Sequence, residues 1–283
     1  MAGTPCPIPY QGSKRRLAPA IVECLPAAFP RLYEPFAGSA AVALATAARR
    51  PDVALVLNDA NAALAGLWRD IIDRPTPLAR AYRALWTAQL GRPREFYDEV
   101  RAEFNATERP ELLLYLLARC VKAAVRYNTH GEFNQSPDNR RLGSRPERMA
   151  AHIGAASALL RGRATVTCRD FRAALARATP ADVIYLDPPY QGVVGAGDRR
   201  YLGAVAYDEF AGALAGFNDR GLSYLISYDG RTGDRVHGRV LPAALGLERR
   251  ELDAGRSTQA TLSGGTARTV ESLYLSPALV ARL

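Results

Sequence analysis

The sequence YLDPPY at residues 185–190 constrains the fold most, because an apolar run is followed at once by a carboxylate and two prolines. Residues 182–186 are short, apolar and partly β-branched, which is typical of a buried strand. Pro188 and Pro189 cannot continue that strand, since proline has a fixed φ and no amide hydrogen. The chain therefore leaves the sheet stiff and extended, with Asp187 at the sheet's edge. Taken alone, these residues favour a strand end with a solvated aspartate.

Composition limits the class of protein. A chain of 283 residues suits one large domain or a core domain with an insertion, and 48% apolar residues exclude general disorder. The formal charge of +9 favours a polyanionic partner. Two of the 37 basic residues are lysines, Lys14 and Lys122. This bias toward arginine directs attention to Lys14.

Cysteine spacing and hydropathy suggest where the chain works. Single, scattered cysteines lack the close pairs of a zinc or redox motif, so we expect free thiols, a reducing cytoplasm and no metal. The cysteines are Cys6, Cys24, Cys120 and Cys168. No apolar stretch approaches the roughly 18 residues of a membrane span, and the N-terminus lacks a signal-peptide pattern. We expect a soluble, cytoplasmic protein with no membrane contact.

The N-terminal part reads as a β-α-β unit. Gly38 and Ser39 lead into an alanine-rich helix that Pro51 ends. Residues 53–59 form an expected strand with a polar tip, and Asn61 can cap the helix that follows. A strand, a glycine turn, a helix and a strand with an acidic tip are typical of a nucleotide-binding fold.

From about residue 74 the pattern becomes helical, most clearly at 77–90 and 111–125, and then rich in turns. Between residues 119 and 148, seven basic residues oppose three acidic ones, a net charge of +4. Alternating helices and strands return from about residue 153, and an antiparallel pair is expected near the C-terminus. We therefore divide the chain into a catalytic domain, residues 1–73 and 153–283, and an inserted target-recognition domain, residues 74–152.

Several short stretches, each weak alone, occur together in one order. They are YQGSK at 10–14, PFAGS at 35–39, ND at 58–59, RYNTHGEFN at 126–134, DF at 170–171 and DPPY at 187–190. In this succession they resemble the Dam-like DNA adenine-N6 methyltransferases of the D12 class (alpha-group). The resemblance covers most of the chain.

The resemblance implies an α/β fold with a Rossmann-like S-adenosylmethionine-dependent methyltransferase sheet flanked by helices, and an inserted, mainly helical DNA-recognition domain. It implies S-adenosylmethionine as the cofactor. Asp59 is expected to accept the ribose hydroxyls, and Lys14 to pair with the cofactor carboxylate. The residues expected to bind the cofactor are Tyr10, Lys14, Glu34, Pro35, Phe36, Gly38, Ser39, Asp59, Asp170 and Phe171. Core packing is the alternative role of both phenylalanines.

The expected reaction is site-specific methyl transfer to the N6 amino group of adenine in double-stranded DNA, after the base is flipped out. Asp187 and the Pro188 carbonyl would accept the amino hydrogens, Pro189 would stiffen the turn, and Tyr190 would stack on the base. Residues expected to contact DNA are Arg126, Asn128, Arg140, Arg141 and Arg145, although an asparagine in a turn-rich segment is more often structural.

Other functions stay open. The chain could be a DNA-binding module of this fold without catalysis, or methylate RNA, cytosine N4 or a glutamine amide. Ser39 replaces a glycine common in relatives, and the sequence after residue 134 differs from that of GATC readers, so this target is not carried over. The resemblance implies bacterial or phage origin, with a cognate restriction endonuclease as a conceivable partner. Residues 191–207 suggest an active-site lid. Oligomeric state is not predicted.

Overall fold

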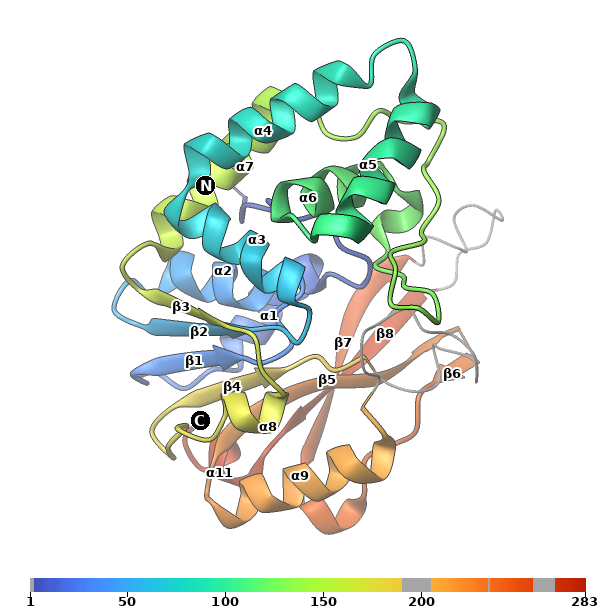
Figure 1. Ribbon diagram of the computed structural model, residues 1–283. Helices are drawn as coiled ribbons and strands as arrows, with labels where there is room; N and C mark the ends of the chain where they lie inside the picture. The colour runs from blue at the N-terminus through green and yellow to red at the C-terminus, as the bar shows by residue number, and fades with distance from the viewer. Residues whose placement is uncertain (1–2, 190–204, 234, 257–267) are drawn as a thin grey trace.

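A computed structural model describes residues 3–189, 205–233, 235–256 and 268–283. In these residues the centre is an eight-stranded sheet with the order β3-β2-β1-β4-β5-β8-β7, while β6 pairs with β5 (Figure 1). The strands are β1 Arg31–Glu34, β2 Ala54–Asn58, β3 Ala164–Thr167, β4 Val183–Leu186, β5 Ser223–Thr232, β6 Arg235–His237, β7 Glu248–Arg256 and β8 Arg268–Leu275.

Strand direction locates the ligand-binding edge. Strands β1 to β5 are parallel, and β8 lies antiparallel between β5 and β7. Strand β1 pairs with both β2 and β4, so the strand order reverses there. Ligands of open α/β sheets bind at this reversal, beside the carboxyl ends of the strands. The expected Rossmann-like methyltransferase sheet and the C-terminal antiparallel pair are both confirmed.

Helices cover both faces of the sheet (Figure 1). One face carries α1 Ala18–Glu23, α2 Ala41–Arg49, α3 Ala62–Asp73 and α7 Pro146–Leu160, and the other carries α8 Phe171–Ala174 and α9 Tyr207–Asp219, with α11 Pro277–Val280 after the last strand. Along β4, Val183 and Tyr185 belong to the first core, whereas Ile184 and Leu186 belong to the second. A strand buried on both faces reads as a continuous apolar run, which explains VIYL.

Three further helices extend the first face, and each begins with a proline at its first position, where no amide hydrogen is needed. They are α4 Pro75–Ala88, α5 Pro93–Thr107 and α6 Pro110–Arg119. Buried side chains such as Leu78, Phe104 and Leu114 join Trp68 of α3 in one hydrophobic core. The expected boundary at residues 152 and 153 falls inside α7, so the division into two domains stays a prediction.

The chain between α6 and α7 is largely irregular. The helix expected over 111–125 is wrong at its C-terminal end, because Cys120 is extended and the short 3₁₀ turn η2 Val121–Ala123 follows. Lys122 and Ala123 have φ values of 59° and 52°, a left-handed conformation that few residues other than glycine adopt. Single bridges, Cys120 with Pro137 and Tyr127 with Phe133, fold this segment back on itself.

No helix in the described ranges is long and apolar enough to cross a membrane. The 3₁₀ turns η1 Lys14–Arg16 and η3 Ala243–Leu245 complete the described elements. All four cysteines are free, as expected.

Candidate active site

The turn after β4 contains Asp187, which is half-buried, and Pro188, which is buried. The Lys14 ammonium lies 2.9 Å from each Asp187 carboxylate oxygen. Lys14 comes from the 3₁₀ turn η1, so the N-terminal YQGSK segment and the turn that contains Asp187 meet in space. Burial raises the pKa of Asp187, and the positive charge of Lys14 opposes that rise.

A second carboxylate, Glu271 on β8, completes this cluster and was missed in the sequence. Its Oε2 atom lies 3.6 Å from the Lys14 nitrogen. Burial raises the pKa of Glu271, Lys14 opposes the rise, and the nearby Asp187 carboxylate adds to it. The available signal was the position of this glutamate in the sequence TVESLYL, residues 269–275. A charge within an otherwise largely apolar strand needs a partner.

Glu34, the last residue of β1, is buried below the start of α2. Its Oε2 atom accepts a hydrogen bond of 2.7 Å from the Ala43 amide. Burial raises the pKa of Glu34 to about 8, and the charge of Asp187 contributes to the shift. The pKa of this side chain therefore lies well above its usual value.

Two contacts connect the glycine loop after β1 to the N-terminal segment. Gly38 has φ +47°, and a β-carbon there would lie 3.1 Å from the Tyr10 ring, so the ring packs directly on the glycine. The Ser39 and Ser13 hydroxyls are 2.7 Å apart and hydrogen-bonded. The loop and the N-terminal segment thus form one surface, with Pro35 buried and Phe36 half-buried beside it.

Asp59 follows β2 and ties the loop to the next helix. Its carboxylate accepts hydrogen bonds from the Gly38 amide at 3.0 Å and the Asn61 amide at 2.9 Å. Burial raises the pKa of Asp59 to about 6, and these two amides oppose the rise. Asn61 also caps α3 as predicted, accepting from the Leu64 amide.

Asp170 and Phe171 lie beyond β3 at the start of α8. The Asp170 carboxylate accepts from the Arg172 amide, and its bonds with the Arg172 side chain lower its pKa. The Phe171 ring is buried, 5.2 Å from the Phe36 ring and 6.0 Å from that of Phe210. Core packing is therefore one role of Phe171, while half-buried Phe36 also faces solvent.

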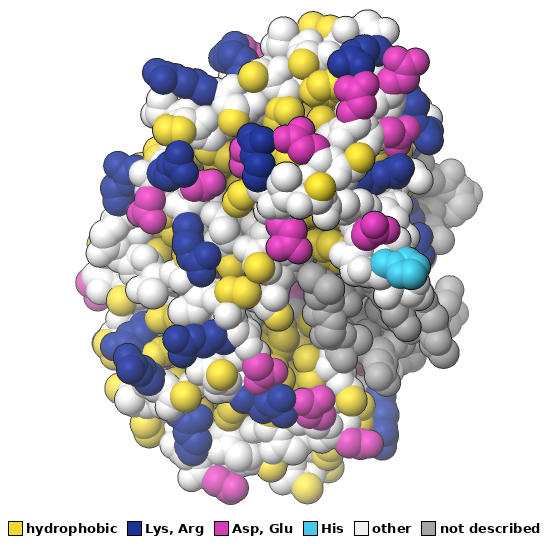
Figure 2. All heavy atoms as spheres, viewed as in Figure 1, with side chains coloured by type: hydrophobic (Ala, Val, Ile, Leu, Met, Phe, Trp, Pro, Cys, Tyr) yellow, Lys and Arg dark blue, Asp and Glu magenta, His cyan; other side chains and the backbone are white. Residues whose placement is uncertain are grey.

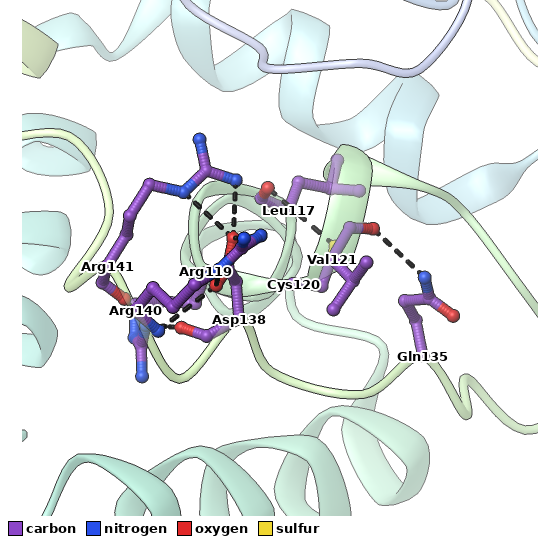
Figure 3. Close-up of polar contacts among 8 residues, drawn as sticks. All are labelled: Leu117, Arg119, Cys120, Val121, Gln135, Asp138, Arg140 and Arg141. Atoms are coloured by element: carbon purple, nitrogen blue, oxygen red, sulfur yellow. Dashed lines mark hydrogen bonds and ion pairs between the residues drawn. The ribbon is translucent and has the colours of Figure 1, made fainter. Parts of the chain in front are cut away.

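The basic residues of the 119–148 segment have distinct surroundings. Arg140 and Arg141 are 83% and 68% exposed, and both turn toward Asp138, whose pKa they hold well below its usual range (Figure 3). Arg119 is buried and donates to the backbone carbonyls of Asp138 and Arg141. Arg119 thus supports the turn, and the two exposed guanidinium groups remain on its surface.

The other residues expected to contact DNA differ in exposure. Arg126 and Arg145 are exposed. Asn128 is engaged in its own turn: its side-chain oxygen accepts from the His130 and Glu132 amides at 2.9 Å each. This supports a structural role for Asn128. Tyr190 and residues 191–204 of the expected lid lie outside the described residues. In Figure 2, basic side chains are spread over the whole visible face among acidic ones.

Four of the expected site residues are acidic side chains that lie along one edge of the sheet. Glu34, Asp59, Asp170 and Asp187 lie at or just beyond the carboxyl ends of the adjacent strands β1, β2, β3 and β4. Carboxylates with an aromatic ring beside them suit a nucleoside that carries hydroxyl and ammonium groups. This set fits the cofactor implied by the sequence. Within the described ranges, no cluster of metal-binding side chains is present.

Comparison with known proteins agrees with this geometry. The model of the family described as D12 class N6 adenine-specific DNA methyltransferase matches residues 10–228. The chain is 32% identical to a DNA adenine methylase of Serratia marcescens over 64% of its own length and 65% of the relative's. It is 33% identical to the retron Ec67 DNA adenine methylase of Escherichia coli, over 65% and 62% respectively.

A third relative, the DNA N-6-adenine-methyltransferase of Escherichia phage P1, is 33% identical over 57% of this chain and 21% of the relative. The matched region thus spans less than two thirds of the length of each of these relatives.

Proposed function

The chain belongs to the family of D12 class N6 adenine-specific DNA methyltransferases, and from this premise we propose that it methylates the N6 amino group of adenine at specific sites in double-stranded DNA. The observation that carries the proposal is the Asp187 carboxylate on a proline-stiffened turn, at the carboxyl end of β4 and beside the strand reversal. The proposal includes action in the cytoplasm of a bacterium or a phage-infected cell.

S-adenosylmethionine is the proposed cofactor, and it supplies an electrophilic methyl group on a sulfonium. Asp59 would accept the ribose hydroxyls, since each carboxylate oxygen has a lone pair beyond the one used by a backbone amide. Asp170, Phe171 and Phe36 would bind the adenine. The loop formed by Pro35, Gly38 and Ser39, together with Tyr10, Lys14 and Glu34, would bind the amino-acid end.

Lys14 can serve two anions at once. Its ammonium has three donors, and it already contacts Asp187 and Glu271. The ammonium also donates to the Gly12 carbonyl at 3.3 Å, so a carboxylate from the cofactor would replace one of these contacts. Burial raises the pKa of Glu34, and an ammonium group brought beside it would lower that pKa.

The chemistry at DNA depends on two acceptors. The lone pair of an exocyclic purine amino group is delocalised into the ring, so this nitrogen is a poor nucleophile. Asp187 and the Pro188 carbonyl would accept its two hydrogens and draw it toward tetrahedral geometry. Because the prolines fix both acceptors, little ordering remains for the moment of reaction. The proton leaves after the nitrogen has become cationic.

The target base must leave the duplex, which takes a few kcal/mol. Tyr190 would stack on the extruded base. In the 119–148 segment, four arginines would contact phosphates or guanine edges: Arg126, Arg140, Arg141 and Arg145. A cognate restriction endonuclease is a separate hypothesis, which co-expression with candidate nucleases and a protection assay would test.

The proposed function is tested with labelled S-adenosylmethionine and mixed-sequence duplex DNA. We expect labelled N6-methyladenine after digestion of the DNA to nucleosides. No label in DNA, despite cofactor binding by calorimetry, would favour a non-catalytic DNA-binding protein. Label in 4-methylcytosine alone, or in RNA alone, would contradict the proposed target. Single-molecule sequencing of DNA from expressing cells then gives the recognition sequence.

A further inference from the structure

The Lys14 ammonium lies between two carboxylates from different parts of the sheet. Asp187, after β4, is 2.9 Å away and Glu271, on β8, is 3.6 Å away. The Lys14 side chain is 12% exposed, and the carboxylates are 21% and 27% exposed. In this partly buried setting, the three charges interact at short range, and solvent and salt screen their interactions only weakly. With both carboxylates ionised, the cluster carries a net charge of −1.

The approach of Glu271 to the cluster is built into the sheet. The β5–β8 register shifts between Ser227 and Gly230, so Gly230 stands opposite Glu271. A β-carbon at Gly230 would lie 2.5 Å from the Val270 carbonyl oxygen. Glycine at this position therefore lets β8 press against β5 where Glu271 projects toward Lys14.

We propose that Glu271 is a positioning residue for methyl transfer. It shares the Lys14 ammonium with Asp187, so that Lys14 neutralises the Asp187 carboxylate less and Asp187 stays a strong hydrogen-bond acceptor. This inference rests on the proposed function. Without Glu271, the chain's own charges at this point, Asp187 and Lys14, sum to zero, so the chain offers no net negative charge to the cationic nitrogen that forms on the base. With Glu271, the net charge of −1 stabilises that cation.

Two other ionisable groups interact with the cluster in the described part of the chain, Glu34 and Tyr185. Glu34 on β1 lies close enough to interact with Asp187, and burial raises its pKa to about 8. Tyr185 on β4 is buried and its hydroxyl is hydrogen-bonded to Ser227 at 2.8 Å. Neither group brings a positive charge, so both carboxylates share the Lys14 ammonium.

Glu271→Gln tests the inference, because glutamine keeps the shape and removes the charge. We expect the single-turnover rate of methylation to fall roughly tenfold or more, while the Kd values for cofactor and DNA stay within about twofold. The acid limb of the pH–rate profile should move to lower pH. Asp187 loses a repelling carboxylate nearby and no longer shares the Lys14 ammonium with it, so the pKa of Asp187 falls. Glu271→Asp should recover part of the rate.

Glu248→Gln is the matched control, since Glu248 lies at the end of the β7–β8 pair, opposite Leu275, and contacts Arg250. It should behave as the unmodified chain. If Glu271→Gln keeps the rate and the pH profile of a parent chain that methylates adenine, or if Glu271→Asp is no better than Gln, the inference is overturned. If the parent chain itself transfers no methyl group to adenine, the proposed function fails instead.

Discussion

The side-chain amide of Asn61 donates a hydrogen bond of 2.9 Å to the hydroxyl of Tyr127. This bond joins the end of β2, where Asp59 accepts from the Asn61 backbone, to the RYNTHGEFN segment. A second link runs from the Gln11 amide to the Ala123 carbonyl at 2.9 Å. The region proposed to bind the cofactor and the segment proposed to contact DNA are therefore in direct contact.

Tyr127→Phe should weaken the linkage between the two ligands. The variant leaves the buried Asn61 amide with one donor unsatisfied, so we expect about 1 kcal/mol lower free energy of unfolding. We also expect a smaller ratio of DNA Kd values measured without and with a cofactor analogue, because linkage is reciprocal. Fluorescence anisotropy gives both Kd values. An unchanged ratio would mean that this bond is structural alone.

Asp187→Ala should abolish methyl transfer and leave cofactor affinity within a few-fold. Loss of one preorganised hydrogen-bonding group commonly lowers kcat by about 10²–10³, and here the Lys14–Glu271 pair that remains would carry no net negative charge beside the reacting nitrogen. Labelled transfer and calorimetry measure the two effects. Asp253→Ala, on exposed β7, is the control. Near-normal transfer by Asp187→Ala would show that the acceptor has been misassigned.

Lys14→Ala should lower the affinity for S-adenosylmethionine, measured by calorimetry, because a cationic partner for its carboxylate is lost. The structure adds a second expectation. Without Lys14, the Asp187 and Glu271 carboxylates repel each other, so the acid limb of the rate profile should move to higher pH. Unchanged affinity would remove Lys14 from the cofactor site.

Glu34→Gln should change how stability depends on pH. The folded chain keeps the Glu34 proton up to about pH 8, whereas the unfolded chain loses it near 4.5. The folded state thus binds more protons in this window, and the free energy of unfolding falls as pH rises through it. Glutamine removes this slope, roughly 1.4 kcal/mol for each unit of pKa shift. Urea unfolding at pH 5 and pH 8 compares the two chains, and equal slopes would contradict the assignment.

Arg126→Ala should weaken DNA binding without changing cofactor affinity. If Arg126 contacts a phosphate, the slope of log Kd against log salt should fall by about one. If it contacts a base, the loss should depend on the DNA sequence. Arg94→Ala, an exposed arginine on α5 paired with Asp98, is the control. Equal losses for the two variants would indicate general charge rather than a contact.

Local patterns predicted most of the strands and the strand-end residues, because apolar runs, caps and prolines act within a few positions. The end of α6 was missed because the left-handed pair Lys122 and Ala123 includes no glycine to announce it. Glu271 and the Asn61–Tyr127 bond depend on contacts between distant segments. Sequence spacing says nothing about these contacts, since sheet register and helix packing create them.

Helices α4, α5 and α6 share a single apolar interior with α2 and α3. Residues 74–152 therefore bury apolar side chains against the rest of the chain, and separating the two parts would expose apolar surface on both. Under the proposed function, a change of DNA target is best sought at exposed side chains such as Arg140 and Arg141, with this shared interior left unchanged.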